Sequence, residues 1–343
     1  MPLLPIVADV YDFVIGVDTH ARAHQYAIVT TAGRVIAERS FPNTTAGIGK
    51  ARDWISHTTG GAVLASIDGA SSYGRRLSVE LESAGYRVVE APTPGYRRAG
   101  KDDRIDAVLA ATSTLPLETD ALRDRRAGTD RDALSVLLTA REDMTREKTQ
   151  KTNALIALTR RFALGIDART TLPLSTIRHL TSPAAHDEPA TTIAAAEAAR
   201  LATRILQLHD ALAANKHDIL TIVRRAAPDL LTEPGIGPVS AATIYTAWSH
   251  PGRIRSEAAF ARIAGTAPKP VSSGNHQRHR LDRSGDRRLN AALHRIAITR
   301  ARTHPETRAY ITRRRQQGRT DRDIRRSLKR YIARHTYRLL EHT

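Results

Sequence analysis

The sequence contains no cysteine, which excludes disulfide bridges, thiolate zinc sites and cysteine nucleophiles. No apolar run approaches the roughly 18 residues that a transmembrane helix requires, so we expect no membrane span. The first nine residues lack a charged segment followed by an apolar one, so we expect no signal peptide. Aromatic residues make up only 4% of the chain, which argues against nucleic-acid binding dominated by base stacking. These absences predict a cytoplasmic protein of bacterial type without a membrane partner.

The excess positive charge is concentrated in one part of the chain. The sequence has 343 residues, enough for two or three domains, and a net charge of +18. Residues 251–343 hold 24 lysines and arginines against 7 acidic residues, whereas the rest of the chain holds 29 against 28. A basic block of this kind usually binds a polyanion. We therefore expect the C-terminal quarter to contact nucleic acid.

Residues 1–125 have the pattern of a mixed α/β domain. Hydrophobic alternation and turn residues predict a fixed order of elements, β-β-β-α-β-α-β-α. The predicted strands are 13–20, 23–31, 34–41, 62–68 and 86–91, and the predicted helices are 44–57, 72–84 and one from about Asp103. This order matches a ribonuclease H-like sheet, with carboxylates at strand ends.

Residues 126–226 are predicted to form a helical arm. Helices are expected over 130–163 and about 190–226, with a proline-containing loop at 164–189. The second helix has apolar residues at alternating spacings of four and three, interrupted by Asn215, the pattern of a coiled-coil seam with one polar position. The seam fits either an antiparallel hairpin or a dimer contact. Its positions are Ala194, Ala198, Leu201, Ile205, Leu208, Leu212, Asn215, Ile219 and Ile222.

Residues 227–343 are predicted to form a basic helical domain. Short helices are expected first, then a Ser/Gly loop at 270–275, then helices near 284–303, 305–317 and 321–340. The segment Pro234-Gly235-Ile236-Gly237-Pro238 is similar to a helix-hairpin-helix turn, in which Gly235 and Gly237 present backbone N–H groups to phosphate oxygens. A turn that merely links two helices fits the same segment. The whole fold class is thus α/β followed by all-α.

Four acidic residues of the first domain are candidate metal ligands. Asp18 and Asp68 end apparent strands, while Asp103 and Asp106 are three apart and share one face of a helix start. Carboxylates that converge on one point suit Mg²⁺, and two such ions can clamp a phosphate during strand cleavage. Each acid alone also fits a strand end or a helix cap, and Asp102 is hardly distinguished from Asp103.

Ser272 and Ser273 lie in a loop followed by a dense set of cations. Cations beside a serine can hold a phosphate and stabilise charge as the hydroxyl attacks. Loop filler is the alternative reading for these serines. The cations are Arg278, Arg280, Arg283, Arg287 and Arg288, with His276 and His279 among them.

Two further groups of side chains have simpler interpretations. The last helices carry basic residues that are expected to follow a phosphate backbone, although a solvated helix face is the alternative. His20 and His24 are interpreted as surface or edge residues, because a spacing of four does not converge on strands. The basic residues are Arg313, Arg314, Arg315, Arg322, Arg325, Arg326, Lys329 and Arg330.

Taken in order, these motifs resemble the insertion-sequence "one-ten" transposases, relatives of the Piv invertases. The segments from Gly16 to His20, from Asp68 to Gly74 and from Lys101 to Ala107 are similar to the RuvC-like DEDD domain of that family. The family's C-terminal transposase domain is similar to four parts of this chain, namely segments 234–242, 264–268 and 283–289 and the Ser273-Gly274 pair. The similarity spans nearly the whole chain.

The resemblance implies a mechanism. The four family acids fall on Asp18, Asp68, Asp103 and Asp106, and the family's catalytic serine, which precedes a glycine, falls on Ser273. The serine is expected to attack a DNA phosphodiester and form a phosphoserine intermediate with help from Mg²⁺. The family also implies a guide (bridge) RNA, and dimers that pair into tetramers, with the acids of one subunit meeting the serine of another. Asp68 departs from the family, which usually has glutamate there.

The sequence therefore predicts a nucleoid-associated DNA recombinase that moves an insertion sequence. One alternative is a RuvC-type Holliday-junction endonuclease, which hydrolyses DNA with metal and water and does not need Ser273. The other is a catalytically decayed nucleic-acid-binding relative, in which Asp68 marks lost activity.

Overall fold

The computed structural model describes residues 4–92, 103–169, 171–182, 187–273, 276–280 and 285–342. The chain divides into two compact units. The first combines Met1–Gly128 with the later segment Trp248–Phe260, and the second combines Thr129–Ala247 with Ala261–Thr343. Among the described residues, no helix combines the length and apolarity needed to cross a membrane.

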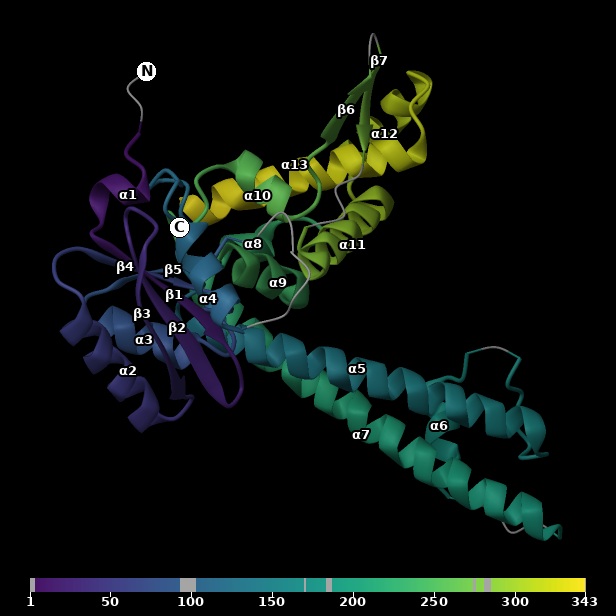
Figure 1. The fold of residues 1–343 in the computed structure, drawn as a ribbon. Helices are drawn as coiled ribbons and strands as arrows, with labels where there is room; N and C mark the ends of the chain where they lie inside the picture. Colours follow the sequence, from purple (N-terminus) through teal and green to yellow (C-terminus); the bar gives the residue numbers. More distant parts are fainter. Residues whose placement is uncertain are drawn as a thin grey trace. The chain divides into compact units, whose positions relative to one another are not determined.

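The first unit is built on a five-stranded mixed sheet (Figure 1). The strand order is β3-β2-β1-β4-β5; β1 pairs antiparallel with β2 and parallel with β4. This is the arrangement expected from the predicted β-β-β-α-β-α-β order, and it is compatible with a RuvC-like domain. The elements are α1 (Val7–Val10), β1 (Phe13–Thr19), β2 (Ala23–Thr30), β3 (Val35–Pro42), α2 (Thr45–Thr58), β4 (Val63–Ile67), α3 (Arg75–Ser83), β5 (Arg87–Glu90) and α4 (Asp103–Thr112).

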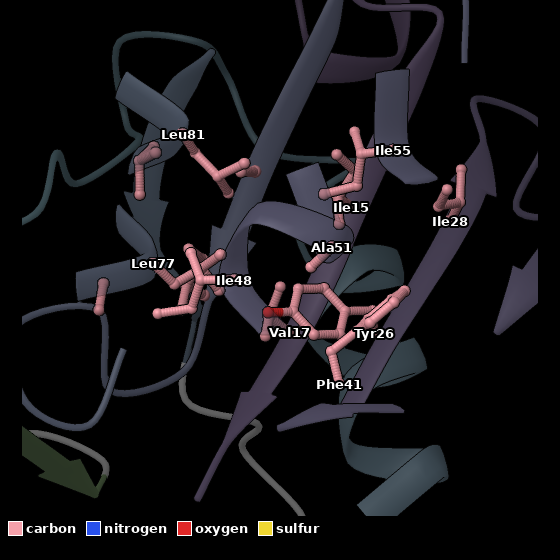
Figure 2. Packing of buried hydrophobic residues seen from close by; sticks show 14 residues of the cluster. Ile15, Val17, Tyr26, Ile28, Phe41, Ile48, Ala51, Ile55, Leu77 and Leu81 are labelled. Carbon is pink, nitrogen blue, oxygen red and sulfur yellow. The ribbon is translucent and has the colours of Figure 1, made fainter. Parts of the chain in front are cut away.

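Helices cover both faces of this sheet because alternate residues of the central strands are apolar on both sides. Figure 2 shows one face, where Ile15 and Val17 of β1 pack with Tyr26 of β2 against α2 and α3. On the other face, Val14 of β1 joins a cluster that includes Ala111 of α4. Strands β1 and β4 are therefore buried almost along their whole length. This burial fixes their register and the position of their carboxyl ends.

The second unit contains a long helical hairpin. Helices α5 (Thr129–Arg161) and α7 (Pro189–Ala226) pack side by side and antiparallel (Figure 1). The buried amide of Asn215 donates to the carbonyl of Leu137 at 3.0 Å, and its oxygen accepts from Arg141 at 3.3 Å. The heptad pattern allowed an antiparallel hairpin or a dimer contact. In the structure the seam packs within the chain, as a hairpin.

The segment between these helices is not only loop, as the sequence had predicted. A short helix, α6 (Leu174–His179), begins after Pro173, which caps it with extended backbone. Ile177 is buried in a cluster with Leu201 and Ile205 of α7. Burial of this one apolar side chain against the hairpin stabilises a turn of helix that is too short to show in the periodicity of the sequence.

The rest of the second unit is mainly helical. Apolar faces of α11 and α13, including Leu293 and Ile332, are buried, and these two helices pack together. The three predicted basic helices are present. The segment Trp248–Phe260 of the first unit holds the last residue of α9 and most of α10. The remaining elements of the chain are α8 (Asp229–Thr232), α9 (Pro238–Trp248), α10 (Glu257–Ile263), β6 (Lys269–Ser273), β7 (His276–Arg280), α11 (Arg287–Thr303), α12 (Pro305–Gln316) and α13 (Asp321–Glu341).

Candidate active site

Asp18 lies on the face of the sheet that α4 covers. Side chains two residues apart along a strand point to the same face. Ser66 of β4 points toward α4, because its hydroxyl donates to the carbonyl of Ala110 at 2.8 Å. Gly16 lies beside Ser66 in the parallel ladder and also faces α4. Asp18, two residues beyond Gly16 on β1, therefore shares the α4 face at the carboxyl edge of the sheet.

Gly16 lets α4 approach the sheet very closely. A Cβ atom at this position would lie 1.9 Å from the carbonyl oxygen of Ala107 and 2.7 Å from the amide nitrogen of Ala111. Toward the other end of β1, Val14 packs in one cluster with Ala111 of α4 and with Leu115, which follows the end of the helix. Helix α4 thus runs opposite to β1, so its first turn, which begins at Asp103, lies toward the carboxyl end of β1.

Asp18 has a buried carboxylate with a histidine beside it. Asp18 is 6% exposed, and its Oδ2 lies 2.8 Å from Nε2 of His20. A carboxylate only accepts hydrogen bonds, so this contact requires a proton on Nε2. A buried carboxylate is costly unless cations or donors compensate it. Asp18 is therefore suited to a site where a cation binds.

His24 is not a surface residue, which corrects the interpretation of the sequence. It is fully buried on β2, and its Nδ1 accepts from the backbone N–H of His20 at 3.3 Å. Burial and the neighbouring His20 lower the pKa of His24, while its side-chain interaction with Asn43 acts to raise it. The alternation of His24, Tyr26 and Ile28 along β2 was the signal that placed His24 on the buried face.

Asp68 follows β4 directly and is held through its backbone. Its N–H donates to the carbonyl of Val17 at 2.9 Å, and its own carbonyl accepts from the hydroxyl of Thr19 at 2.7 Å. Gly69 has a φ of 69°, and a Cβ there would clash with Thr19 at 2.8 Å. The side chain of Asp68 is exposed. The backbone contacts fix the position from which this carboxylate extends.

Asp106 lies in the first turn of α4 and is exposed. Asp103 begins this helix, as predicted, but its side chain lies outside the described residues, as does Asp102. No three acidic or histidine side chains form a metal-binding group within the part of the chain that the structure describes. Carboxylate oxygens are nevertheless the donors that Mg²⁺ prefers, so these residue types fit the ion. The four-carboxylate site stays a prediction.

Ser273 lies in a hairpin, and not in the loop that the sequence had predicted. It is the last residue of β6, and it pairs with His276, the first residue of β7. Arg278 and Arg280 lie on β7 opposite Val271 and Lys269. The hairpin forms through backbone pairing of short polar segments, which no hydrophobic alternation announces. Side chains of both strands, and Arg283, lie outside the described residues.

Comparisons with protein families cover both regions that carry these residues. A transposase model of the IS110 DEDD type matches residues 15–163. A second model, described as the Transposase IS116/IS110/IS902 family, matches residues 227–312. The chain carries the transposase domains of the IS110 family. No curated protein matches the chain.

These two domains support a DNA transposase or recombinase and imply a DNA substrate. The transposase domains expected from the resemblance are confirmed at this level. The first IS110 domain includes Asp18, Asp68, Asp103 and Asp106, and the second includes Ser273. Domains of the DEDD type are usually metal-dependent.

In the second IS110 domain, the glycine turn packs against two helices. Gly235 has a φ of 77°, and a Cβ there would lie 3.2 Å from the side chain of Arg300. Arg300 donates to the carbonyl of Pro234 at 2.6 Å and to Glu233 at 2.8 Å. His335 of α13 also pairs with Glu233 at 2.8 Å. These contacts favour the reading in which Gly235 serves the packing of a turn.

Glu233 of this turn pairs with both Arg300 and His335. Burial acts to raise the pKa of Glu233, but the hydrogen bonds and positive charges of His335 and Arg300 outweigh it and lower the pKa. Gly237, in contrast, has open space where a side chain would be. Of the two glycines, Gly237 is the one that leaves room for a ligand.

The basic residues predicted to contact nucleic acid differ in how much of their charge is compensated. Arg287 and Arg313 are exposed, and Arg313 lies over the ring of Tyr310. Arg288 pairs with Glu142 of α5 at 2.7 Å, and Arg315 pairs with Asp321 at 2.8 Å. Arg314 donates to the side-chain oxygen of Gln317 at 2.7 Å. Ion pairs on the surface are weak, so phosphate groups can compete for the paired arginines.

Proposed function

We propose that this protein is a DNA recombinase that moves an insertion sequence with Ser273 as nucleophile and an acidic Mg²⁺ site. The observation that carries the proposal is the approach of α4 to Gly16, because it directs the helix start that bears Asp103 and Asp106 toward Asp18. The two IS110 domains supply the second support, since each contains one half of the proposed site.

In the proposed site, Asp18, Asp68, Asp103 and Asp106 hold the ion. When bound, Mg²⁺ polarises a phosphodiester and neutralises the charge that develops on its oxygens. The protein contributes a carboxylate that is already buried, at Asp18, and a carboxylate whose backbone is fixed, at Asp68. His20 restrains the Asp18 carboxylate through its 2.8 Å contact. Asp18 and Asp68 are thus proposed to bind the ion from positions that the fold already holds.

The proposed covalent step takes place at Ser273. Its Oγ forms a bond to the phosphorus of one DNA strand as the bond from phosphorus to the leaving deoxyribose oxygen breaks. A carboxylate accepts the hydroxyl proton, and the leaving deoxyribose oxygen takes this proton from it. A serine hydroxyl is a weak nucleophile that requires such activation. Arg278 and Arg280, on the strand paired with β6, are proposed to stabilise the phosphate charge.

Asp68 is expected to alter the metal affinity, and not the chemistry. Aspartate is one methylene shorter than the glutamate that the family usually has at this position. An exposed side chain at a fixed strand end must reach the ion with that shorter stem. Asp68→Glu should therefore bind Mg²⁺ at least as tightly as the natural chain in a calorimetric titration.

A guide RNA and a dimer or tetramer are also proposed, on the family resemblance. Sequencing of the nucleic acid that co-purifies with the protein, expressed with its native flanking DNA, tests the RNA. An RNA encoded by those flanks is expected; its absence, with recombination intact, would contradict this part of the proposal.

A strand-exchange assay with variants tests the proposal and separates it from the two alternatives. Ser273→Ala should eliminate strand exchange, whereas Ser272→Ala should have a milder effect. Asp18→Asn or Asp106→Asn should abolish Mg²⁺-dependent cleavage with the fold intact, because each removes a ligand charge. Cleavage that survives Ser273→Ala would favour the RuvC-type hydrolytic nuclease. A natural chain that binds DNA but never cleaves it would favour the decayed relative.

A further inference from the structure

A segment from late in the sequence completes the first unit. Trp248–Phe260 begins at the last residue of α9, yet it folds with Met1–Gly128. The hydroxyl of Ser249 accepts from the N–H of Ala127 at 3.0 Å and donates to the carbonyl of the same residue at 3.1 Å. Nε2 of His250 lies 3.2 Å from the carbonyl of Arg125. We call residues 249–253 the strap, since they bind residues 124–127 along the edge beyond β5.

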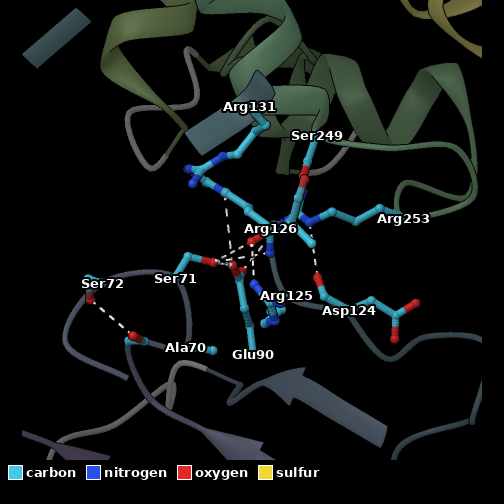
Figure 3. A network of polar contacts seen from close by, with 12 residues as sticks. Ala70, Ser71, Ser72, Glu90, Asp124, Arg125, Arg126, Arg131, Ser249 and Arg253 are labelled. Atoms are coloured by element: carbon cyan, nitrogen blue, oxygen red, sulfur yellow. Dashed lines mark hydrogen bonds and ion pairs between the residues drawn. The ribbon is translucent and has the colours of Figure 1, made fainter. Parts of the chain in front are cut away.

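The strongest contacts of the strap come from Arg253. Its side chain is only 4% exposed, and its guanidinium donates to the carbonyl of Asp124 at 3.0 Å and to Glu90 at 3.2 Å (Figure 3). A buried guanidinium is stable only when its donors are paired with good geometry. Arg253 therefore fixes the carboxylate of Glu90, which ends β5.

Glu90 in turn contacts the loop that carries Asp68. The hydroxyl of Ser71 donates to Glu90 at 3.2 Å and accepts from the N–H of Arg126 at 3.0 Å (Figure 3). Ser71 lies within a tight turn, because the carbonyl of Gly69 accepts from the N–H groups of both Ser72 and Gly74. A displacement of Ser71 is thus transmitted to Asp68 through a turn with little freedom.

We propose that Arg253 is a positioning residue for the acidic site, acting on Asp68 through Glu90 and Ser71. This inference rests on the proposed metal-binding role of Asp68. The strap belongs to the stretch of chain that leads to β6 and Ser273, so the sequence that carries the nucleophile also fixes one of the acids. Groups that orient metal ligands in this way commonly change metal affinity by about 10-fold or more when removed.

Direct titration of the full-length protein with Mn²⁺, followed by electron paramagnetic resonance, tests the inference. Ser71→Ala and Arg253→Lys should each raise the half-saturating Mn²⁺ concentration about 10-fold. Lysine keeps the charge but lacks the fork of donors that reaches both Asp124 and Glu90. Ser71→Ala leaves the contacts of Arg253 in place, so it remains informative if the Arg253 variant folds poorly.

A matched control is Glu82→Ala. Glu82 pairs with Arg125, whose side chain is 8% exposed, but in this network it is not the acceptor for Ser71. This variant should lower the melting temperature and leave Mn²⁺ affinity unchanged. If Glu82→Ala weakened Mn²⁺ binding as much as Ser71→Ala does, the inference would be overturned. A general loss of stability would then explain both effects.

Asp68→Asn separates the failure of this inference from the failure of the proposed site. If Asp68→Asn weakens Mn²⁺ binding but Ser71→Ala and Arg253→Lys do not, only the positioning role is wrong. Mn²⁺ affinity like that of the natural chain in Asp68→Asn would overturn the proposed metal site and this inference with it.

Discussion

At the scale of single residues, Gly16 sets how closely α4, which carries two of the proposed metal ligands, approaches β1. Replacement by alanine puts a Cβ 1.9 Å from the carbonyl of Ala107, so α4 must move away from β1. Forcing an extra methyl into a packed core usually costs about 1–3 kcal/mol. We expect Gly16→Ala to lower the free energy of unfolding by that amount, measured by denaturant titration, and to impair Mg²⁺-dependent cleavage.

Gly49→Ala is the matched control. Gly49 lies inside α2, and a Cβ there meets nothing within 4 Å. Alanine is the better helix former by up to about 1 kcal/mol, so this variant should be slightly more stable with unchanged cleavage. If Gly16→Ala were as stable and active as Gly49→Ala, the close approach of α4 would not matter for the site.

The candidate site could be predicted from the sequence only where local signals exist. Asp18, Asp68 and Asp103 each stand at the end or the start of an element that has a clear hydrophobic pattern. The burial of His24 and the contact between Ser71 and Glu90 depend on which strands become neighbours. Such pairings join residues far apart in the sequence, so residue spacing alone does not reveal them.

At the scale of elements, the α5–α7 seam makes a clear prediction. Leu208 is 2% exposed on α7, whereas its neighbour Gln207 is exposed. Leu208→Asp would bury a charge without a partner, at a cost of several kcal/mol. We expect a large fall in melting temperature for Leu208→Asp and almost none for Gln207→Asp. Equal melting temperatures would show that this face of α7 is exposed.

The turn that bears Gly235 should respond to pH through Glu233. Because the folded-state pKa of Glu233 is lowered, its contribution to stability is present above the ordinary glutamate pKa of about 4.3 and is lost as pH falls through the lower folded value. The difference in unfolding free energy between the natural chain and Glu233→Gln should therefore be larger at pH 6 than at pH 3. A difference independent of pH would contradict the role of this ion pair.

Elements with a long or regular hydrophobic pattern were predicted from the sequence close to where they occur. The five strands of the first unit and the helices α5, α7, α11, α12 and α13 belong to this group. Helix α6 and the β6–β7 hairpin were not predicted. Both are short, and both are stabilised by contacts with other parts of the chain or by backbone pairing, which leave no periodic pattern.

At the scale of the whole molecule, the C-terminal charge predicts salt-sensitive DNA binding. Each phosphate contact that is lost reduces the slope of log K against log salt concentration by about 0.9. Replacing the exposed Arg287, Arg313 and Arg322 by glutamine should reduce both affinity and slope in a filter-binding titration. Three exposed arginines outside the basic block, changed in the same way, provide the control: Arg146, Arg169 and Arg200.

An equal loss of affinity in both triple variants would show that net charge matters and the location does not. These substitutions are preferable to removal of residues 251–343, because Arg253 and its neighbours belong to the first unit. That discontinuity is the feature of the whole molecule that the sequence did not predict. The domain boundaries predicted from the sequence, after residue 125 and before residue 227, follow changes in composition. The strap joins the first unit through hydrogen bonds to a distant segment, which composition does not reveal.

The central claim is that Ser273 forms a covalent bond to DNA. The most direct measurement is trapping of the full-length protein on a nicked DNA substrate with Mg²⁺, followed by protease digestion and mass spectrometry of the DNA-linked peptide. We expect DNA linked through phosphorus to the Oγ of Ser273, and we expect this adduct to be absent in Ser273→Ala and in Asp106→Asn. Cleavage without any adduct, or an adduct on Ser272, would contradict it.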